Sequence, residues 1–158
     1  MPTENKPKIM HYIDSPQYEL ELTSKYCKAL LSQVFAKVTK EISGEEFAML
    51  DTISCNKGMC QRDLAKMLLK DRANTGRLLE SLEKKGFVLR YNDTKNNRLV
   101  RKVDITPEGE KILEVLTEKL APIRAKADEI IGEEDLIIMR ASLKKLRDVA
   151  SKVVDIQI

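Results

Sequence analysis

The sequence of 158 residues predicts a mainly α-helical protein with one small β-hairpin. Long segments with apolar residues at helical spacing lie toward both ends of the chain. Two short helical patterns follow each other between positions 61 and 85. Two runs rich in β-branched and large apolar residues, 87–91 and 99–105, flank a polar loop at 92–98. The length fits one domain, in which the helices outnumber the strands.

The first part of the chain predicts an arm and two helices. Residues 1–16 contain three of the five prolines, so we expect an arm there. Residues 17–40 contain no Gly or Pro and predict a long helix. Residues 44–53 predict a second helix, in which Ser43 and Glu46 form a capping box. The apolar stripe of the long helix consists of Cys27, Leu30, Leu31, Val34, Phe35 and Val38.

The central helices are closely spaced. A turn at 55–58 leads into helices predicted at 61–69 and 72–85. Asp71 is a suitable N-cap for the second helix, and Gly86 is a suitable residue to end it.

The C-terminal part predicts two more helices. Thr106 caps the first, and Pro122 within it predicts a kink or a break. The acidic residues after Gly132 favour the start of the last helix. Its apolar residues form a heptad seam that is either buried within the chain or used for self-association, and the separation of the two terminal helical segments favours the second. The seam consists of Leu136, Met139, Leu143, Leu146, Ala150 and Val153.

Basic residues are concentrated in the middle of the chain. Residues 61–102 contain 12 Lys or Arg against 5 Asp or Glu, a net charge of +7, whereas the remainder contains 16 against 20, a net charge of −4. This distribution is typical of a segment that binds a polyanion. A solvated basic face without a partner is the alternative. Aromatic residues make up only 4% and Trp is absent, which argues against base stacking on single strands.

The composition argues against catalysis, metal binding and membrane insertion. With one His, no metal-ligand cluster, no Gly-rich phosphate loop and no nucleophile motif, we expect no enzyme activity, no cofactor and no metal. The N-terminus lacks the apolar run of a signal peptide, and no stretch approaches the ~18 apolar residues of a membrane span. The three cysteines form no CxxC pair, so we expect a reducing, cytoplasmic compartment.

Two helices joined by a short turn and followed by a basic hairpin predict a winged helix-turn-helix, whose second helix lies in the major groove of DNA. Arg72, Asn74 and Arg77 face outward at the start of that helix. Arg can donate two hydrogen bonds to guanine, and Asn can pair with adenine in the same way.

The hairpin loop supplies the other candidate DNA contacts. A narrow loop that carries cations can enter the minor groove, whose negative potential attracts them. An ordinary surface hairpin is the alternative. The candidates in the loop are Lys95, Asn96, Asn97 and Arg98.

Three motifs carry a resemblance to a known family. In chain order they are EEFAMLDTI, QRDLAKMLLKDRANTGRLLESLEKKGFVLRY and, after the wing, DITPEGEKIL. From Ser43 to Gly109 the chain resembles the MarR family of transcription regulators. The resemblance implies one domain over 1–158, with a helical dimerisation platform at 17–42 and 107–156 and a winged helix-turn-helix at 44–106.

The resemblance also implies a function. The expected protein is a homodimer that binds double-stranded DNA at a pseudo-palindromic operator and acts as a repressor. A small-molecule ligand or an oxidant is expected to alter its affinity for DNA. The alternative is a winged-helix module that binds proteins and not DNA.

The wing departs from the family pattern. Family members usually carry an Asp followed by two Arg, where this chain has Asn96, Asn97 and Arg98. The segment from Arg98 to Thr106 is also one residue longer than usual, which predicts a β-bulge or a shifted register.

Cys60 is a candidate redox sensor, with Cys55 as its resolving partner. It stands where the family usually has a Ser or Thr that caps the first helix of the pair. The positive end of the helix dipole favours the thiolate, whereas the nearby Asp63 carboxylate opposes it. The alternative is a reduced, partly buried thiol that packs as a small apolar residue.

Overall fold

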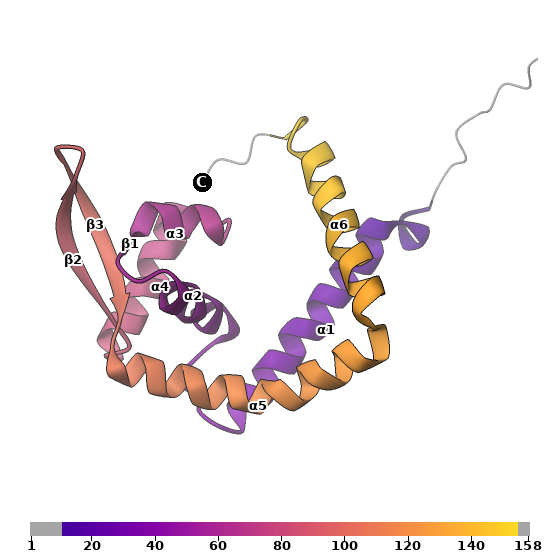
Figure 1. The fold of residues 1–158 in the computed structure, drawn as a ribbon, viewed down its shortest axis with the longest axis horizontal. Coiled ribbons are helices and arrows are strands. Elements are labelled where there is room, and N and C mark those ends of the chain that lie inside the picture. Colours follow the sequence, from indigo (N-terminus) through magenta and orange to yellow (C-terminus); the bar gives the residue numbers. More distant parts are fainter. Residues whose placement is uncertain (1–10, 155–158) are drawn as a thin grey trace, which may run out of the picture.

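The computed structural model describes residues 11–154 and confirms a mainly helical fold with an antiparallel wing sheet (Figure 1). The first ten residues of the predicted arm and the last two of the predicted segment 107–156 lie outside the described residues. The elements are a 3-10 turn at Tyr12–Asp14, α1 (Pro16–Ala36), α2 (Gly44–Cys55), β1 (Met59–Cys60), α3 (Gln61–Met67), α4 (Arg72–Lys84), β2 (Val88–Lys95), β3 (Arg98–Ile105), α5 (Pro107–Ile131) and α6 (Glu133–Ala150).

The first two helices begin at capped residues. The Tyr18 N–H donates to Ser15 Oγ at 3.2 Å, and Pro16 occupies the first position of α1, so this helix starts inside the segment predicted as an arm. The predicted capping box of α2 is confirmed. The Ser43 N–H donates to Glu46 Oε2 at 2.9 Å, and the Glu46 N–H donates to Ser43 Oγ at 3.2 Å.

The helix pair follows the prediction except at the end of its first helix. α3 ends at Met67 instead of residue 69, because Leu69 has a φ of 49°, in the left-handed region that cannot continue a helix. Asp71 caps α4 as predicted, and its Oδ1 accepts the Asn74 N–H at 2.7 Å. Gly86, with a φ of 77°, follows the end of α4.

The wing is more regular than the sequence predicted. β2 and β3 pair without interruption from Val88↔Ile105 to Lys95↔Arg98, so the predicted β-bulge is wrong. The alternative, a register shifted from the family pattern, stays a prediction. The predicted loop at 92–98 is only a two-residue turn, Asn96–Asn97. Both residues have positive φ, 51° and 59°, which is the geometry of a type I′ turn and a reason for Asn at both positions.

A third strand was not predicted. β1 pairs with β3 through Met59↔Val103 and Cys60↔Lys102, which gives the sheet order β1-β3-β2. Two residues are too few to show the alternation by which a strand is recognised in a sequence. The strand fixes the start of α3 against the wing.

The long helix α5 is held against the base of the wing. Thr106 caps it, because the Gly109 N–H donates to Thr106 Oγ1 at 3.0 Å. A Cβ at Gly109 would lie 2.1 Å from the Phe87 carbonyl oxygen and 2.9 Å from Ile105 Cγ1, so only glycine fits there. The helix continues through Pro122 to Ile131, and the predicted break does not occur.

The hydrophobic core lies between the helices of the central module and the wing, with the end of α1 and the first half of α5 closing it. Its largest fully buried apolar side chains are Phe35, Met49, Leu50, Ile53, Leu64, Leu79, Leu82, Val103 and Leu116. In contrast, α6 contributes no buried residue.

The heptad seam of α6 is not buried within the chain. Met139 and Leu146 are 44% and 45% exposed, and Val153 is 84% exposed. In Figure 1, α6 extends on the side of the molecule away from the wing. Leu136 and Leu143 are half-buried, so the seam is only partly covered within one chain, which favours the second alternative, self-association.

Candidate nucleic-acid interface

The interface is built on the packing of α4 against α3 and α2. Leu64 and Ala65 of α3 are buried, as are Leu78 and Leu82 of α4. Ala65, a small residue, is 4% exposed. The start of α4 is thereby fixed with its polar side chains toward solvent.

The three candidate residues of α4 form one exposed group. Arg72 and Arg77 are exposed, and Asn74 is half-buried between them in sequence. Arg77 Nη2 donates to Asn74 Oδ1 at 2.8 Å, so these two side chains are already oriented together. A Cβ at Gly76 would meet a single atom within 4 Å, Gln61 Nε2 at 3.9 Å. The surface beside Asn74 and Arg77 is therefore open.

The C-terminal end of α4 is anchored by a buried carboxylate. Glu46 is 5% exposed, and its Oε1 accepts hydrogen bonds from Lys85 Nζ at 2.6 Å and Ser81 Oγ at 2.7 Å. Burial works to raise the pKa of Glu46, but the hydrogen bonds from Lys85, the Ser43 N–H and Ser81 outweigh it and leave that pKa below its usual value. This network connects α2 to the end of α4.

An ion pair between Arg90 of β2 and Glu83 ties the wing to α4. The Arg90 N–H also donates to Glu83 Oε1 at 3.2 Å. The hydrogen bonds from Arg90 hold the pKa of Glu83 below its usual value. The wing is therefore fixed to α4 at its base, and its tip extends freely (Figure 1).

The cations of the wing fall into two groups. Lys102 pairs with Asp93 at 2.6 Å, and their hydrogen bond raises the pKa of Lys102 and lowers that of Asp93. Lys95, Arg98 and Arg101 are exposed and form no ion pair with any residue in 11–154. These three cations are available to an external anion.

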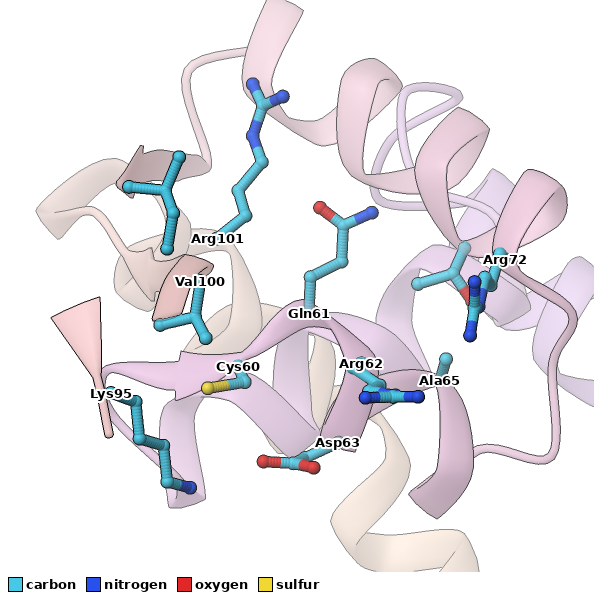
Figure 2. Close-up of a pocket in the computed structure, with 11 residues that line it drawn as sticks. Cys60, Gln61, Arg62, Asp63, Ala65, Arg72, Lys95, Val100 and Arg101 are labelled. Atoms are coloured by element: carbon cyan, nitrogen blue, oxygen red, sulfur yellow. The ribbon is translucent and has the colours of Figure 1, made fainter. Parts of the chain in front are cut away.

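A hollow of about 550 Å³ lies between α3, α4 and the wing, and we call it the wing hollow (Figure 2). It brings together two residues predicted separately, Arg72 of α4 and Lys95 of the wing. It also includes residues that were not predicted, notably Gln61, Arg62 and Arg101. The complete lining is Cys60, Gln61, Arg62, Asp63, Ala65, Arg72, Thr75, Lys95, Leu99, Val100 and Arg101.

The predicted residues thus fall into three places. Asn74 and Arg77 lie together on α4, and Arg72 and Lys95 lie on the wing hollow. Asn96, Asn97 and Arg98 lie at the wing tip, where the turn conformation already accounts for the two asparagines. The net charge of the segment was the only sequence signal that included Arg62 and Arg101.

The candidate redox cysteines lie in different elements. Cys60 is half-buried, follows Met59 in β1 and lines the wing hollow. It precedes α3 without a side-chain capping hydrogen bond. Cys55 is the exposed last residue of α2, and both thiols are free.

Two findings concern residues 11–154 only. No group of three or more His, Cys, Asp or Glu side chains in this range is placed to hold a metal ion. None of its helices has the length and apolar composition needed to cross a membrane.

The sequence is similar to proteins of one family. The profile of the MarR family matches residues 42–100. An uncharacterised HTH-type transcriptional regulator of Bacillus cereus is 26% identical over 113 residues, which are 71% of this chain and 74% of that protein. The HTH-type transcriptional regulator FarR of Neisseria gonorrhoeae is 26% identical over 110 residues, 68% of this chain and 75% of FarR.

A solved structure shares the fold. The structure of S. aureus MepR in complex with DNA matches with a TM-score of 0.76 at 23% identity, over 89% of this chain and 99% of MepR. The match extends over the helices on both sides of the winged module as well as over the module itself, because it covers nearly the whole chain.

Proposed function

The chain belongs to the MarR family of DNA-binding transcription regulators, and we propose that it acts as a homodimeric repressor on a pseudo-palindromic operator. In this proposal α4 of each subunit enters a major groove, and the wing tip enters the adjacent minor groove. Arg72, Asn74 and Arg77 contact the DNA in the major groove, where they read bases or position the helix. Lys95 and Arg98 contact the DNA from the wing.

The single observation that carries the proposal is the common exposure of α4 and the wing cations. Arg72, Arg77, Lys95 and Arg98 are all exposed, and none forms an ion pair within the described part of the chain. Cations without partners on a reading helix and its wing suit a polyanion. MepR, which shares this fold, has been solved in complex with DNA.

We propose that residues 17–42 and 107–156 form the dimerisation platform and that 44–106 form the DNA-binding module of a single domain. The support is the exposed apolar surface of the C-terminal helices, which includes Ile130 at 73%, Ile137 at 61% and Val149 at 63%. An apolar surface of this kind on a regulator favours association. Two subunits on a two-fold axis would present their α4 helices to successive major grooves.

Repression, the response to an effector and the cytoplasmic location complete the proposal. A dimer bound over a promoter excludes other proteins, and a small molecule or an oxidant that alters the α4–wing geometry would release it. The oxidant alternative rests on Cys60, because it adjoins both α3 and the wing hollow. The protein works in the compartment that holds the DNA, so we propose the cytoplasm.

A salt titration tests the DNA-binding geometry against the alternative of a protein-interaction module. Exposed Met67 and Leu69 at the turn before α4 are the residues that a docking partner could use. If the wing binds phosphates, Lys95→Ala with Arg98→Ala lowers the slope of log K against log salt by about one unit per lost contact. Unchanged affinity and slope in this double variant would remove the wing from the interface.

A further inference from the structure

We propose that the wing hollow binds one sugar–phosphate backbone of bound DNA, with Arg62, Arg101 and Gln61 as phosphate contacts. The inference rests on the proposed function and assigns residues that neither the helix nor the wing tip accounts for.

The place of the wing hollow relative to bound DNA follows from the positions of α4 and the wing tip in two neighbouring grooves. A major groove and its adjacent minor groove are separated by one sugar–phosphate backbone. If α4 lies in the first and the wing tip in the second, the surface between α4 and the wing must face that backbone. The wing hollow occupies this place, with Arg72 of α4 on one wall and Lys95 of the wing on another (Figure 2).

The charge of the wing hollow fits a polyanion. Its lining contains four cations from four elements and the single carboxylate of Asp63, a net charge of +3. None of the four forms an ion pair with a residue of the described chain. A backbone that passes between the walls would contact cations on both sides. The four are Arg62 of α3, Arg72 of α4, Lys95 of β2 and Arg101 of β3.

Two buried polar atoms on the lining lack partners. Thr75 is 1% exposed and its Oγ1 forms no hydrogen bond, and the buried Oε1 of Gln61 forms none either. Both atoms are covered by surrounding protein atoms, so neither contacts a phosphate directly in this conformation. The Nε2 of Gln61, at the other end of the same amide, can donate to a phosphate oxygen.

A small anionic molecule is the rival occupant. The volume of about 550 Å³ would admit one, but small-molecule sites are lined mainly by apolar and aromatic side chains. Seven of the eleven lining residues are charged, amide or hydroxyl residues, and none is aromatic. The four cations among them favour the backbone of a nucleic acid, whose recognition depends on phosphate contacts.

The test compares Arg62→Ala and Arg101→Ala with the wild-type protein on two duplexes, an operator and an unrelated sequence of equal length. Each variant of the dimer loses two contacts, so the slope of log K against log salt should fall in magnitude by about 1.8 and the affinity roughly 30-fold at about 0.15 M salt. Both duplexes should be affected equally, because phosphates carry no sequence information. Lys111→Ala, an exposed cation on α5, is the matched control and should leave both quantities unchanged.

Gln61→Met is a second variant that roughly keeps the side-chain volume. It should weaken binding to both duplexes a few-fold without altering the salt slope, because a neutral amide displaces no counterion. Its thermal stability should be retained, since Gln61 Oε1 has no partner within the described chain. This variant separates a lost contact from a lost fold.

A third test replaces the DNA phosphates between the half-site and the flanking minor groove with neutral methylphosphonates. This replacement should weaken DNA binding by the wild type. It should weaken binding by Arg62→Ala or Arg101→Ala little further, because these variants have already lost the contact. Wild-type affinity and slope in both variants, or a loss confined to the operator, would overturn the proposal. A wild type that binds neither duplex at low salt would instead overturn the proposed function itself.

Discussion

Gly109→Ala tests the packing of α5 on the wing, because two effects of opposite sign compete there. In a helix interior, Ala is favoured over Gly by about 1 kcal/mol, which is the upper limit for Gly109 as the third residue of α5. The added Cβ at residue 109, however, would lie 2.1 Å from the Phe87 carbonyl oxygen, which also accepts the Thr106 N–H at 3.0 Å. That oxygen belongs to the backbone at the base of the wing and cannot move independently.

The magnitude follows from these two terms. Forcing a methyl group into a filled site typically costs about 1–3 kcal/mol, and contact with backbone favours the upper end, about 3 kcal/mol. After subtraction of about 1 kcal/mol for helix propensity, we expect Gly109→Ala to destabilise the protein by about 2 kcal/mol. For a chain of this size that corresponds to a fall in Tm of roughly 4–8 °C.

Gly76→Ala is the matched control. Its Cβ would meet only Gln61 Nε2 at 3.9 Å, an ordinary contact, so the helix-propensity term acts alone. We expect this variant to be stabilised by about 1 kcal/mol, a rise in Tm of roughly 2–4 °C. Thermal unfolding followed by circular dichroism at equal protein concentration measures both. A Gly109→Ala variant as stable as wild type, or more stable, would refute the close approach of α5 to Phe87.

Three further predictions concern the platform, the buried carboxylate and the thiol. Leu146→Glu places a charge in the proposed dimer seam; analytical ultracentrifugation should show monomers with reduced operator binding, and a dimer of wild-type stability would mean that this stripe faces solvent. The pKa of Glu46 is lowered in the folded state, so its contribution to stability is full above its usual pKa of about 4.3 and is lost as the pH falls through the lower folded-state value. Urea unfolding as a function of pH should therefore lose less stability on acidification in Glu46→Gln than in wild type, and parallel curves would contradict the role of the Lys85 network. If Cys60 is a redox sensor, peroxide should abolish DNA binding by the wild type and spare Cys60→Ser, whereas equal sensitivity of the two would exclude Cys60.

Helix ends with local caps could be predicted accurately from the sequence. The Ser43–Glu46 box, Asp71 and Thr106 all form the predicted hydrogen bonds, because a cap depends on residues three positions apart. The end of α3 was placed two residues too late, because the left-handed Leu69 carries no such signal.

Features that depend on distant residues could not be predicted. β1 is a strand only because β3 lies beside it, and the clash that requires Gly109 comes from Phe87, outside its helix. The regular pairing of the wing was hidden by its polar residues, which resemble a loop in composition. The two-residue turn at Asn96–Asn97 sets the strand register of the wing. The sequence alone did not identify this turn, which is recognised by the positive φ angles of both residues.

The candidate site likewise combines residues that local sequence predicts with residues that only the packing of distant elements brings together. Arg72 and Arg77 follow from their positions at the start of a predicted helix, and the structure exposes both. Arg62 and Arg101 lie on different elements, and only the packing of β3 beside α3 brings them to one hollow.

Selection of bound duplexes from a random pool, carried out with the wild type and Arg77→Ala, tests the central claim most directly. A two-fold symmetric dimer that reads DNA with α4 should enrich a pseudo-palindrome whose half-sites are centred about 10 base pairs apart. Arg77→Ala should relax the preference at one position of each half-site and cost about 1–3 kcal/mol there. Enrichment of a single half-site, or the same enriched sequence with uniformly weaker binding by Arg77→Ala, would contradict the claim.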